Sequence, residues 1–230
     1  MNKKIDLAVF DMAGTTVNEN NIVYKTVQQS INDQGYTVSL EEVLEHGAGK
    51  EKYQAILDIL KNTTSCEDIE DTAKRAFSNF KPILKNIYKQ SDVRAFDKVE
   101  ELFGILRNNN VKIVLNTGYD SKTANQLIKK LNWKKGVDYD ALLTADDVTN
   151  GRPHKEMICK AMQMFTITDP SRVLKVGDSA IDIEEGKNAD CGITVGVLTG
   201  AQNKEQLQKA KPDFIINELL ELRKIIFYLD

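Results

Sequence analysis

Short apolar runs recur along this chain, and several of them stop at an acid, a glycine or a hydroxyl residue. The first occupies residues 7–10 and stops at Asp11; others occupy residues 111–115, 141–143, 173–176, 193–197 and 214–216. Such runs are typical of buried strands. From residue 111 onward, helical patterns separate them, one of which is formed by Ala124, Leu127, Ile128 and Leu131. The alternation predicts an α/β fold with a parallel sheet flanked by helices.

The stretch between the first two runs has a different pattern. Residues 18–92 show helical stripes and no convincing strand, and Pro82 is expected to kink or end one of the helices. We therefore predict a core domain of residues 1–17 and 93–230 and a helical domain of residues 18–92, with joints at 17–21 and 90–93. An insert after the first strand lies at the edge where ligands bind in open α/β sheets, so it could act as a lid.

Composition excludes several classes of function. The 230 residues carry 34 acids and 31 bases, with a net charge of −3, which does not indicate nucleic-acid binding. No apolar run approaches the roughly 18 residues of a membrane span, and no targeting segment is evident. Two histidines and three widely spaced cysteines argue against a His-rich zinc site or a disulfide framework, and favour a reducing cytoplasm. The chemistry must therefore come mainly from carboxylates, hydroxyls, Lys and Arg.

Acids follow two of the predicted strands. Asp11 comes directly after the first run, with Gly14 allowing a sharp turn, and Asp178 and Asp182 follow the run at 173–176. Hard cations such as Mg²⁺ bind carboxylate oxygens of this kind. Taken alone, Asp178 and Asp182 could also be N-cap and first-turn residues of a helix, and Asp11 part of a simple turn.

Two further motifs contain groups suited to phosphate. Thr117, Gly118 and Tyr119 follow the second run, and a hydroxyl with a free backbone N–H at a helix start can hold phosphate. Arg152 follows Gly151 before another helix and could bind phosphate or balance the acids. The alternatives are an ordinary N-cap and a surface arginine.

In this order, the four motifs resemble those of the haloacid dehalogenase superfamily over essentially the whole chain, and the helical insert resembles its C1-type cap. The resemblance implies a Rossmann-like core and a Mg²⁺-dependent hydrolase. Asp11 would be the nucleophile that forms an aspartyl-phosphate. The Mg²⁺ ligands would be Asp11, the backbone carbonyl of Ala13 and Asp178, and Asp182 would contribute to the metal site through water or by supporting another ligand.

The resemblance also implies residues that bind the substrate. Thr117 and the Gly118 N–H would hold the transferring group, and Arg152 would offset charge between the nucleophile and the phosphate. Thr15 and Tyr119, which lie in the same motifs, are predicted to contact the substrate. The expected partner is a small phosphorylated or phosphonate substrate. We expect neither nucleic acid nor membrane as a partner, and we leave a homodimer open as an assembly state.

One position departs from the common phosphatase pattern. Most phosphatases of the superfamily carry a second Asp two residues after the nucleophile, where this chain has Ala13. A general acid/base contributes about 10²–10⁴-fold to rate, so its absence is costly for ester hydrolysis. The phosphonoacetaldehyde hydrolase (phosphonatase) branch lacks that Asp, and its motifs are similar to those around Asp11, Thr117 and Arg152. That branch cleaves a C–P bond after a lysine forms a Schiff base with the substrate aldehyde.

The Gly-x-x-Lys spacing from Gly47 to Lys50 resembles the lysine loop of that branch, so Lys50 is the predicted Schiff-base residue. Lys50 is also expected to begin the helix that carries Tyr53, which stands where the branch usually has a histidine. His46 precedes the loop and is a candidate substrate contact. Two alternatives stay open: a phosphate-monoester hydrolase without a Schiff base, and a catalytically weak protein that binds a phosphorylated ligand.

Overall fold

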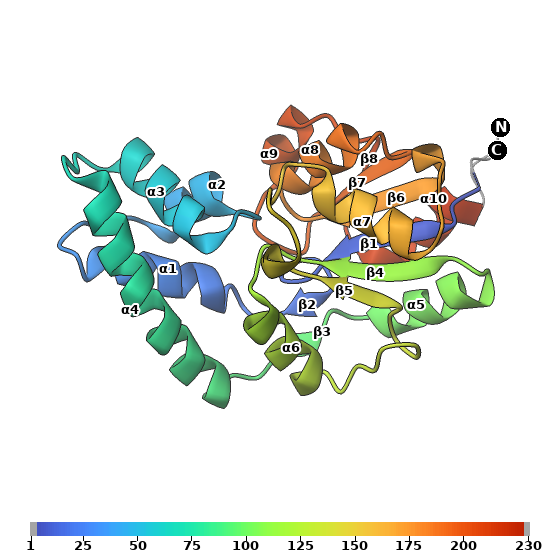
Figure 1. Ribbon diagram of the computed structural model, residues 1–230, viewed down its shortest axis with the longest axis horizontal. Helices are drawn as coiled ribbons and strands as arrows, with labels where there is room; N and C mark the ends of the chain where they lie inside the picture. The colour runs from blue at the N-terminus through green and yellow to red at the C-terminus, as the bar shows by residue number, and fades with distance from the viewer. Residues whose placement is uncertain (1–3, 228–230) are drawn as a thin grey trace.

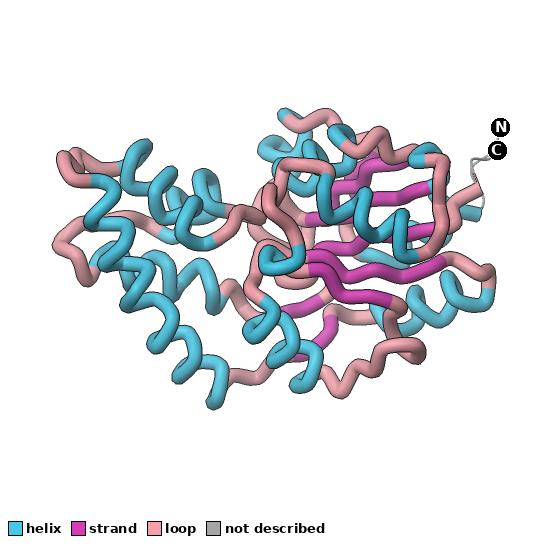
Figure 2. The backbone as a smooth tube through the Cα atoms, in the orientation of Figure 1, coloured by secondary structure: helices cyan, strands magenta, loops and turns pink. Residues whose placement is uncertain are grey.

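A six-stranded parallel sheet forms the centre of the computed structural model, which describes residues 4–227 (Figures 1 and 2). The strand order is β5-β4-β1-β6-β7-β8. Their bounds are β1 Leu7–Asp11, β4 Lys112–Asn116, β5 Ala141–Leu143, β6 Val173–Gly177, β7 Ile193–Val197 and β8 Phe214–Ile216. The predicted α/β class is confirmed, and each predicted run is a strand.

Both faces of the sheet are covered by helices, as the alternation along β1 shows. Phe10 packs toward Phe103 of α5 (Val99–Asn108), with ring centroids 5.3 Å apart. Leu7 and Val9 belong to a separate apolar cluster with residues of α7 (Glu156–Met164). The remaining core helices are α6 Ser121–Lys130, α8 Ala180–Asn188, α9 Lys204–Lys209 and α10 Leu222–Phe227, with 3₁₀ turns η1 Ala145–Asp147, η2 Pro170–Arg172 and η3 Leu219–Glu221.

Four helices form a unit beside the sheet, at the left of Figure 1. They are α1 Ile22–Asn32, α2 Leu40–Gly47, α3 Lys52–Thr63 and α4 Ile69–Gln90. The chain enters this unit after β2 (Val17–Asn18) and leaves it through β3 (Arg94–Ala95), and the two short strands pair antiparallel. The entry and exit segments therefore lie side by side. None of the helices in the described chain is long and apolar enough to cross a membrane.

Three local expectations were wrong or incomplete. Helix α4 continues through Pro82 to Gln90, because Phe80, Leu84 and Tyr88 on one face are all buried and hold it on the other helices. Helix α2 was not predicted, although Ser39 and Glu42 form a capping box at its start. Helix α3 begins at Lys52, after the N-cap Glu51, and not at Lys50.

Candidate active site

Three buried acids meet at the carboxyl edge of the sheet. Asp11 ends β1, Asp178 follows the adjacent strand β6, and Asp182 lies in the first turn of α8. One carboxylate oxygen from each lies within 4.8 Å of the others. The N-cap of α8 is Ser179, so Asp178 is not that helix's cap. Neighbouring parallel strands bring the two motifs together, as their positions predicted.

Glycines allow the acids to approach the backbone closely. Gly14 has φ +90°, and an added Cβ there would lie 2.3 Å from an oxygen of Asp178. An added Cβ on Gly177 would lie 2.1 Å from the carboxyl carbon of Asp182. Both positions therefore require glycine for space, and Gly14 also for conformation.

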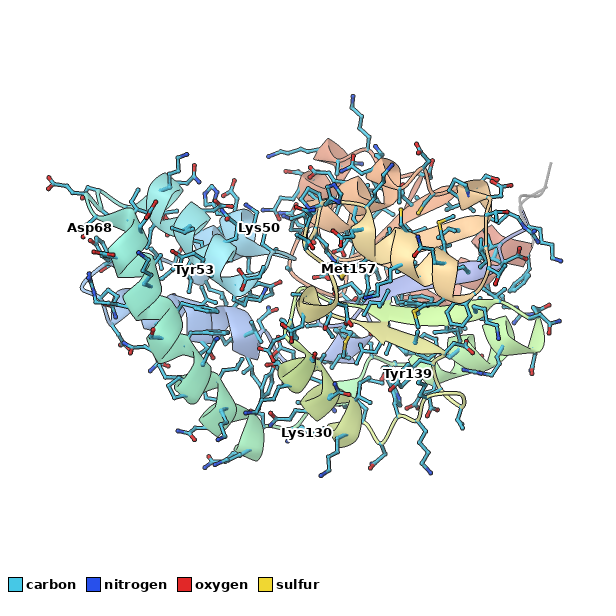
Figure 3. The ribbon with its side chains drawn as sticks, viewed as in Figure 1. Lys50, Tyr53, Asp68, Lys130, Tyr139 and Met157 are labelled. Carbon is cyan, nitrogen blue, oxygen red and sulfur yellow. The ribbon has the colours of Figure 1, made fainter. Side chains whose placement is uncertain are left out.

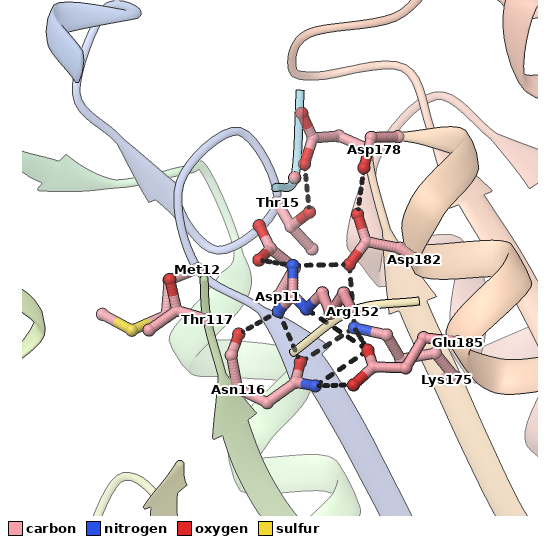
Figure 4. A network of polar contacts seen from close by, with 12 residues as sticks. Asp11, Met12, Thr15, Asn116, Thr117, Arg152, Lys175, Asp178, Asp182 and Glu185 are labelled. Carbon is pink, nitrogen blue, oxygen red and sulfur yellow. Dashed lines mark hydrogen bonds and ion pairs between the residues drawn. The ribbon is translucent and has the colours of Figure 1, made fainter. Parts of the chain in front are cut away.

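Buried cations lie among the acids, with Arg152 between Asp11 and Asp182 (Figure 4). The guanidinium of Arg152 contacts Asp11 at 2.7 Å, Asp182 at 2.9 Å and Glu185 at 3.3 Å. The Lys175 amine contacts Asp182 at 2.9 Å and Glu185 at 3.2 Å. Arg152 is 8% exposed, which excludes the surface alternative. The structure places Arg152 beside Asp11, the predicted nucleophile.

Asn116 connects the two cations. Its side-chain oxygen accepts from Arg152 at 2.9 Å and from Lys175 at 2.8 Å, and its amide donates to Glu185 at 2.9 and 3.0 Å. Sequence reasoning missed Asn116, Lys175 and Glu185. A lysine inside the apolar run 173–176 was the available signal, because a buried charge requires partners.

The charge balance of this network fits a divalent cation. Asp11, Asp178, Asp182 and Glu185 are four buried carboxylates, and Arg152 with Lys175 supplies two buried cations. Two negative charges are left over when all ionise, and a bound Mg²⁺ would balance them.

The pKa shifts of the three acids reflect where the two buried cations lie. Burial, and then the charges of Asp11 and Asp182, hold the pKa of Asp178 well above its usual range. Burial also raises the pKa of Asp11, against the opposing charge of Arg152. The pKa of Asp182 is lowered, because Lys175 and Arg152 together outweigh its burial. Asp178 is thus the acid that most lacks a cation.

The predicted substrate-binding residues surround this edge. Thr15 donates to Asp178 at 2.9 Å. Thr117 is buried and accepts from the backbone N–H of Tyr119 at 3.2 Å. The N-cap of α6 is Asp120, so Thr117 does not have that role. The helical unit lies close against the core at Gly118. An added Cβ on this glycine would lie 2.9 Å from the Gly49 carbonyl oxygen.

The backbone at Ala13 lies in the turn between the nucleophile and β2. The N–H groups of Thr15, Thr16 and Val17 all point to the Met12 carbonyl oxygen, within 3.2 Å. Ala13 is 8% exposed. Its side chain has no acid or base, and its predicted role as a carbonyl ligand stays a prediction.

Two lysines at the start of helix α3 have different surroundings: Lys50 precedes the helix and Lys52 is its first residue. Lys50 lies where the helical unit meets the core (Figure 3), and its amine pairs with Asp58, with 30% of the side chain exposed. Lys52 is 5% exposed, and its amine lies 5.2 Å from the ring centroid of Tyr24 and 5.3 Å from that of Tyr119. Lys52 also feels the charge of Asp11. The buried amine of this segment therefore belongs to Lys52, a residue that the sequence analysis did not single out, and it donates to the Lys50 carbonyl oxygen.

Burial lowers the pKa of Lys52 to about 8, against the raising effect of nearby acids. The loop contains two overlapping Gly-x-x-Lys matches, Gly47 to Lys50 and Gly49 to Lys52. Spacing alone could not choose between them.

Two openings are lined by other residues of the site. One is lined by Lys50, Arg152, His154 and Ile181 among others, and the second by Lys52, Gly118, Tyr119 and Phe80 among others. His46 is half-buried in the last turn of α2 and lines neither of these openings. Its role as a substrate contact stays a prediction.

Comparison with known proteins agrees with this geometry. Residues 8–197 match the family model described as haloacid dehalogenase-like hydrolase. A protein named phosphonoacetaldehyde hydrolase from Lactiplantibacillus plantarum is 29% identical, over 86% of this chain and 77% of its own length. A protein of the same name from Bacillus cereus is 30% identical over the same shares.

Solved structures share the fold. A phosphonoacetaldehyde hydrolase like protein from Oleispira antarctica superposes with a TM-score of 0.82 at 22% identity, covering 98% of this chain and 92% of its own. A predicted phosphoglycolate phosphatase from Haemophilus somnus gives 0.77 at 20% identity, covering 96% and 97%. This chain thus belongs to the haloacid dehalogenase-like hydrolases and is related to the proteins named phosphonoacetaldehyde hydrolase.

Proposed function

We propose that this hydrolase cleaves the C–P bond of a small aldehyde-bearing phosphonate, with Asp11 as nucleophile and Lys52 as the Schiff-base lysine. The observation that carries the proposal is the buried amine of Lys52, held between Tyr24 and Tyr119 and within the electrostatic influence of Asp11. Residues 18–92 would act as the cap that brings this amine to the core.

The low pKa of Lys52 suits it to attack a carbonyl. An amine with a pKa of about 8 is neutral in an appreciable fraction at pH 7, whereas an ordinary lysine is almost wholly charged. The neutral amine adds to the substrate aldehyde, and loss of water gives an iminium. The iminium is an electron sink for the neighbouring C–P bond.

Asp11 then acts on phosphorus. Its carboxylate forms a P–O bond while the C–P bond breaks, and the C–P electron pair moves into the iminium to give a neutral enamine on Lys52. Water hydrolyses the aspartyl-phosphate. A proton on carbon and a second water release the aldehyde from Lys52. This route needs no acid on a leaving oxygen, which agrees with alanine at position 13.

Arg152 and Lys175 would keep Asp11 and Asp182 fixed during the transfer. Thr117 and the Gly118 N–H are the proposed contacts for the transferring group. Asp11, Asp178, Asp182 and the Ala13 carbonyl are the groups that would hold Mg²⁺, directly or through water. The ion would neutralise charge on the phosphonate oxygens.

The test is borohydride trapping with phosphonoacetaldehyde and Mg²⁺, followed by peptide mass mapping. We expect a reduced adduct on Lys52, with release of phosphate and acetaldehyde. Lys52→Ala should lose the adduct and C–P cleavage. Lys50→Ala, two positions away in the same loop, is the matched control and should keep both.

Other outcomes would assign a different role. An adduct on Lys50 would return the Schiff base to the residue predicted from the sequence. No adduct, together with turnover of simple phosphate monoesters by Lys52→Ala, would support an ester phosphatase instead. No turnover with intact Mg²⁺ binding would support a protein that only binds its ligand.

A further inference from the structure

Glu185 is a fully buried carboxylate in helix α8, about one turn after Asp182. It lies outside the trio of acids whose oxygens approach one another, which consists of Asp11, Asp178 and Asp182. Both of its oxygens instead accept from the side-chain amide of Asn116, at 3.0 and 2.9 Å. A buried charge needs partners, and Glu185 has an amide and two cations as partners, away from the predicted metal ligands.

Asn116 lies between the nucleophile and the predicted phosphate-binding residues. It is the last residue of β4 and pairs in register with Asp11, the last residue of β1. Thr117, a proposed contact for the transferring group, follows it directly. The placement of Asn116 therefore affects both the strand beside the nucleophile and the residue proposed to hold the phosphoryl group.

The Glu185 carboxylate determines which way the Asn116 amide faces (Figure 4). A carboxylate accepts hydrogen bonds and cannot donate them, so the Nδ2 donors of Asn116 must turn toward it. The amide oxygen then faces the cations, and it accepts from Arg152 at 2.9 Å and from Lys175 at 2.8 Å. If the amide were reversed, its oxygen would face a carboxylate and its donors would face two cations.

Arg152 is thereby contacted at all three of its nitrogens. Its Nη2 donates to the side-chain oxygen of Asn116 and, at 2.6 Å, to the carbonyl oxygen of the same residue. Its Nε pairs with Glu185 at 3.3 Å, which leaves Nη1 to donate to Asp11 at 2.7 Å. We propose that Glu185 is a positioning residue that, through Asn116, aims the Arg152 guanidinium at Asp11. This inference rests on the proposed role of Asp11 as nucleophile, and it applies equally to C–P and P–O cleavage.

Glu185→Gln keeps the size of the side chain and replaces one acceptor by a donor. That donor would face the donors of Asn116 or the ammonium of Lys175, so the Asn116 amide should rotate and Arg152 should shift with it. A shift of about 1 Å in a positioned group can cost on the order of 10²-fold in rate. We therefore expect phosphate release to slow by at least about tenfold.

A double variant that exchanges the two groups tests the link between them. When Asn116→Asp is combined with Glu185→Gln, the amide at position 185 donates to the carboxylate at position 116, whose other oxygen still accepts from Arg152 and Lys175. The total charge is that of the wild type. The double variant should recover most of the lost rate. Asn116→Asp alone places two carboxylates together and should lose at least as much as Glu185→Gln.

The experiment follows single turnovers of the full chain with phosphonoacetaldehyde and Mg²⁺, and measures the borohydride-trapped adduct on Lys52 separately from phosphate release. The Lys52 amine donates to the Lys50 carbonyl oxygen, outside the network of Glu185. Glu185→Gln should therefore form the adduct as the wild type does and slow only phosphate release. The exposed Glu205→Gln, in the first turn of α9, is the control and should match the wild type in both measurements.

Phosphate release at the wild-type rate in Glu185→Gln would overturn the positioning role, and so would a loss that the double variant does not recover. An equal loss of adduct and phosphate release, with a lower melting temperature, would show a general structural role instead. If Glu185→Gln does not fold, Asn116→Asp and the double variant give the same comparison, because they differ only at position 185.

Failure of the proposed function has a different signature. If the wild type forms no adduct on Lys52, the Schiff-base function is overturned, and the positioning role is then measured by hydrolysis of p-nitrophenyl phosphate with Mg²⁺. That reaction also depends on Asp11 and Arg152, so the same loss in Glu185→Gln and the same recovery in the double variant are expected. A wild-type protein that cleaves neither compound would overturn both proposals.

Discussion

Among the buried acids of the site, Asp178 is the one most affected by the shortage of positive charge. It is buried among Asp11 and Asp182, and no ion pair within residues 4–227 reaches it. Asp178→Asn removes a buried, uncompensated charge, so it should raise the melting temperature of the protein in EDTA. The same variant should lose the stabilisation by Mg²⁺, which for the wild type is about 2.7 kcal/mol at a hundred times its Kd.

Thermal unfolding with EDTA and with Mg²⁺ measures both effects. The exposed Asp92→Asn is the control, because it removes the same charge without touching the site. If Mg²⁺ raised the melting temperature of Asp178→Asn as much as that of the wild type, this result would contradict a role for Asp178 in holding Mg²⁺.

Glu19 should also make stability depend on pH. Burial raises its folded pKa to about 7, above the unfolded value of 4.5, so the folded state binds the proton more tightly. Stability is therefore lost as pH rises from about 4.5 to about 7, by about 3 kcal/mol for the full shift. Lys52, with a folded pKa of about 8 below an unfolded 10.5, contributes a constant amount below pH 8. Urea unfolding at pH 5, 6 and 7 should show that the free energy of unfolding falls less with rising pH in Glu19→Gln than in the wild type.

The residues that sequence reasoning found share a local signal. Asp11, Asp178 and Arg152 stand directly after a strand or before a helix, where position along the chain predicts position in the fold. Lys52 has no such signal. It becomes a candidate because tertiary packing buries it, and burial is what lowers its pKa. The choice between Lys50 and Lys52 likewise depended on which of the two side chains is buried.

At the scale of elements, the loop after β7 ties the two acid motifs together. The Thr199 hydroxyl donates to the Gly14 carbonyl at 2.6 Å, and the Ala201 N–H donates to Asp178 at 2.6 Å. Thr199→Val should cost about 1 kcal/mol of unfolding free energy, because one hydrogen bond is lost and a carbonyl is left without it. It should also weaken Mg²⁺ binding several-fold, since the turn carrying Gly14 contacts Asp178.

Calorimetric titration with Mg²⁺ and urea unfolding test this together. Thr63→Val is the matched control, because that hydroxyl also donates to a carbonyl, within helix α3. The control should lose stability and keep its Mg²⁺ affinity. Equal Mg²⁺ affinity in both variants would show that the loop after β7 does not support the metal site.

The elements themselves were predictable where hydrophobic burial selects them. Every strand of the main sheet is an apolar run long enough to be recognised. The pair β2–β3 has two residues per strand and no apolar signature, so only the meeting of the entry and exit segments creates it. Pro82 does not end α4, because the packing of this helix outweighs one missing hydrogen bond.

At the scale of the whole molecule, the contact at Gly118 couples the helical unit to the core. An added Cβ there would lie 2.9 Å from the Gly49 carbonyl oxygen and 3.2 Å from that of Lys50. Gly118→Ala should therefore push the loop that carries Lys52 away from Asp11. Displacements of about 1 Å can cost on the order of 10²-fold in rate, so kcat/KM for phosphonoacetaldehyde should fall by at least tenfold.

The Mg²⁺-dependent rise in melting temperature should remain in Gly118→Ala, because the acids lie on the core. Gly104→Ala is the control, because an added Cβ on this exposed residue of α5 meets nothing within 4 Å. This variant should gain about 0.5–1 kcal/mol of unfolding free energy and keep full activity. If Gly118→Ala lost the Mg²⁺ effect along with turnover, the glycine would be supporting the acid cluster itself. Loss of turnover alone would locate the defect in how closely the helical unit approaches the nucleophile.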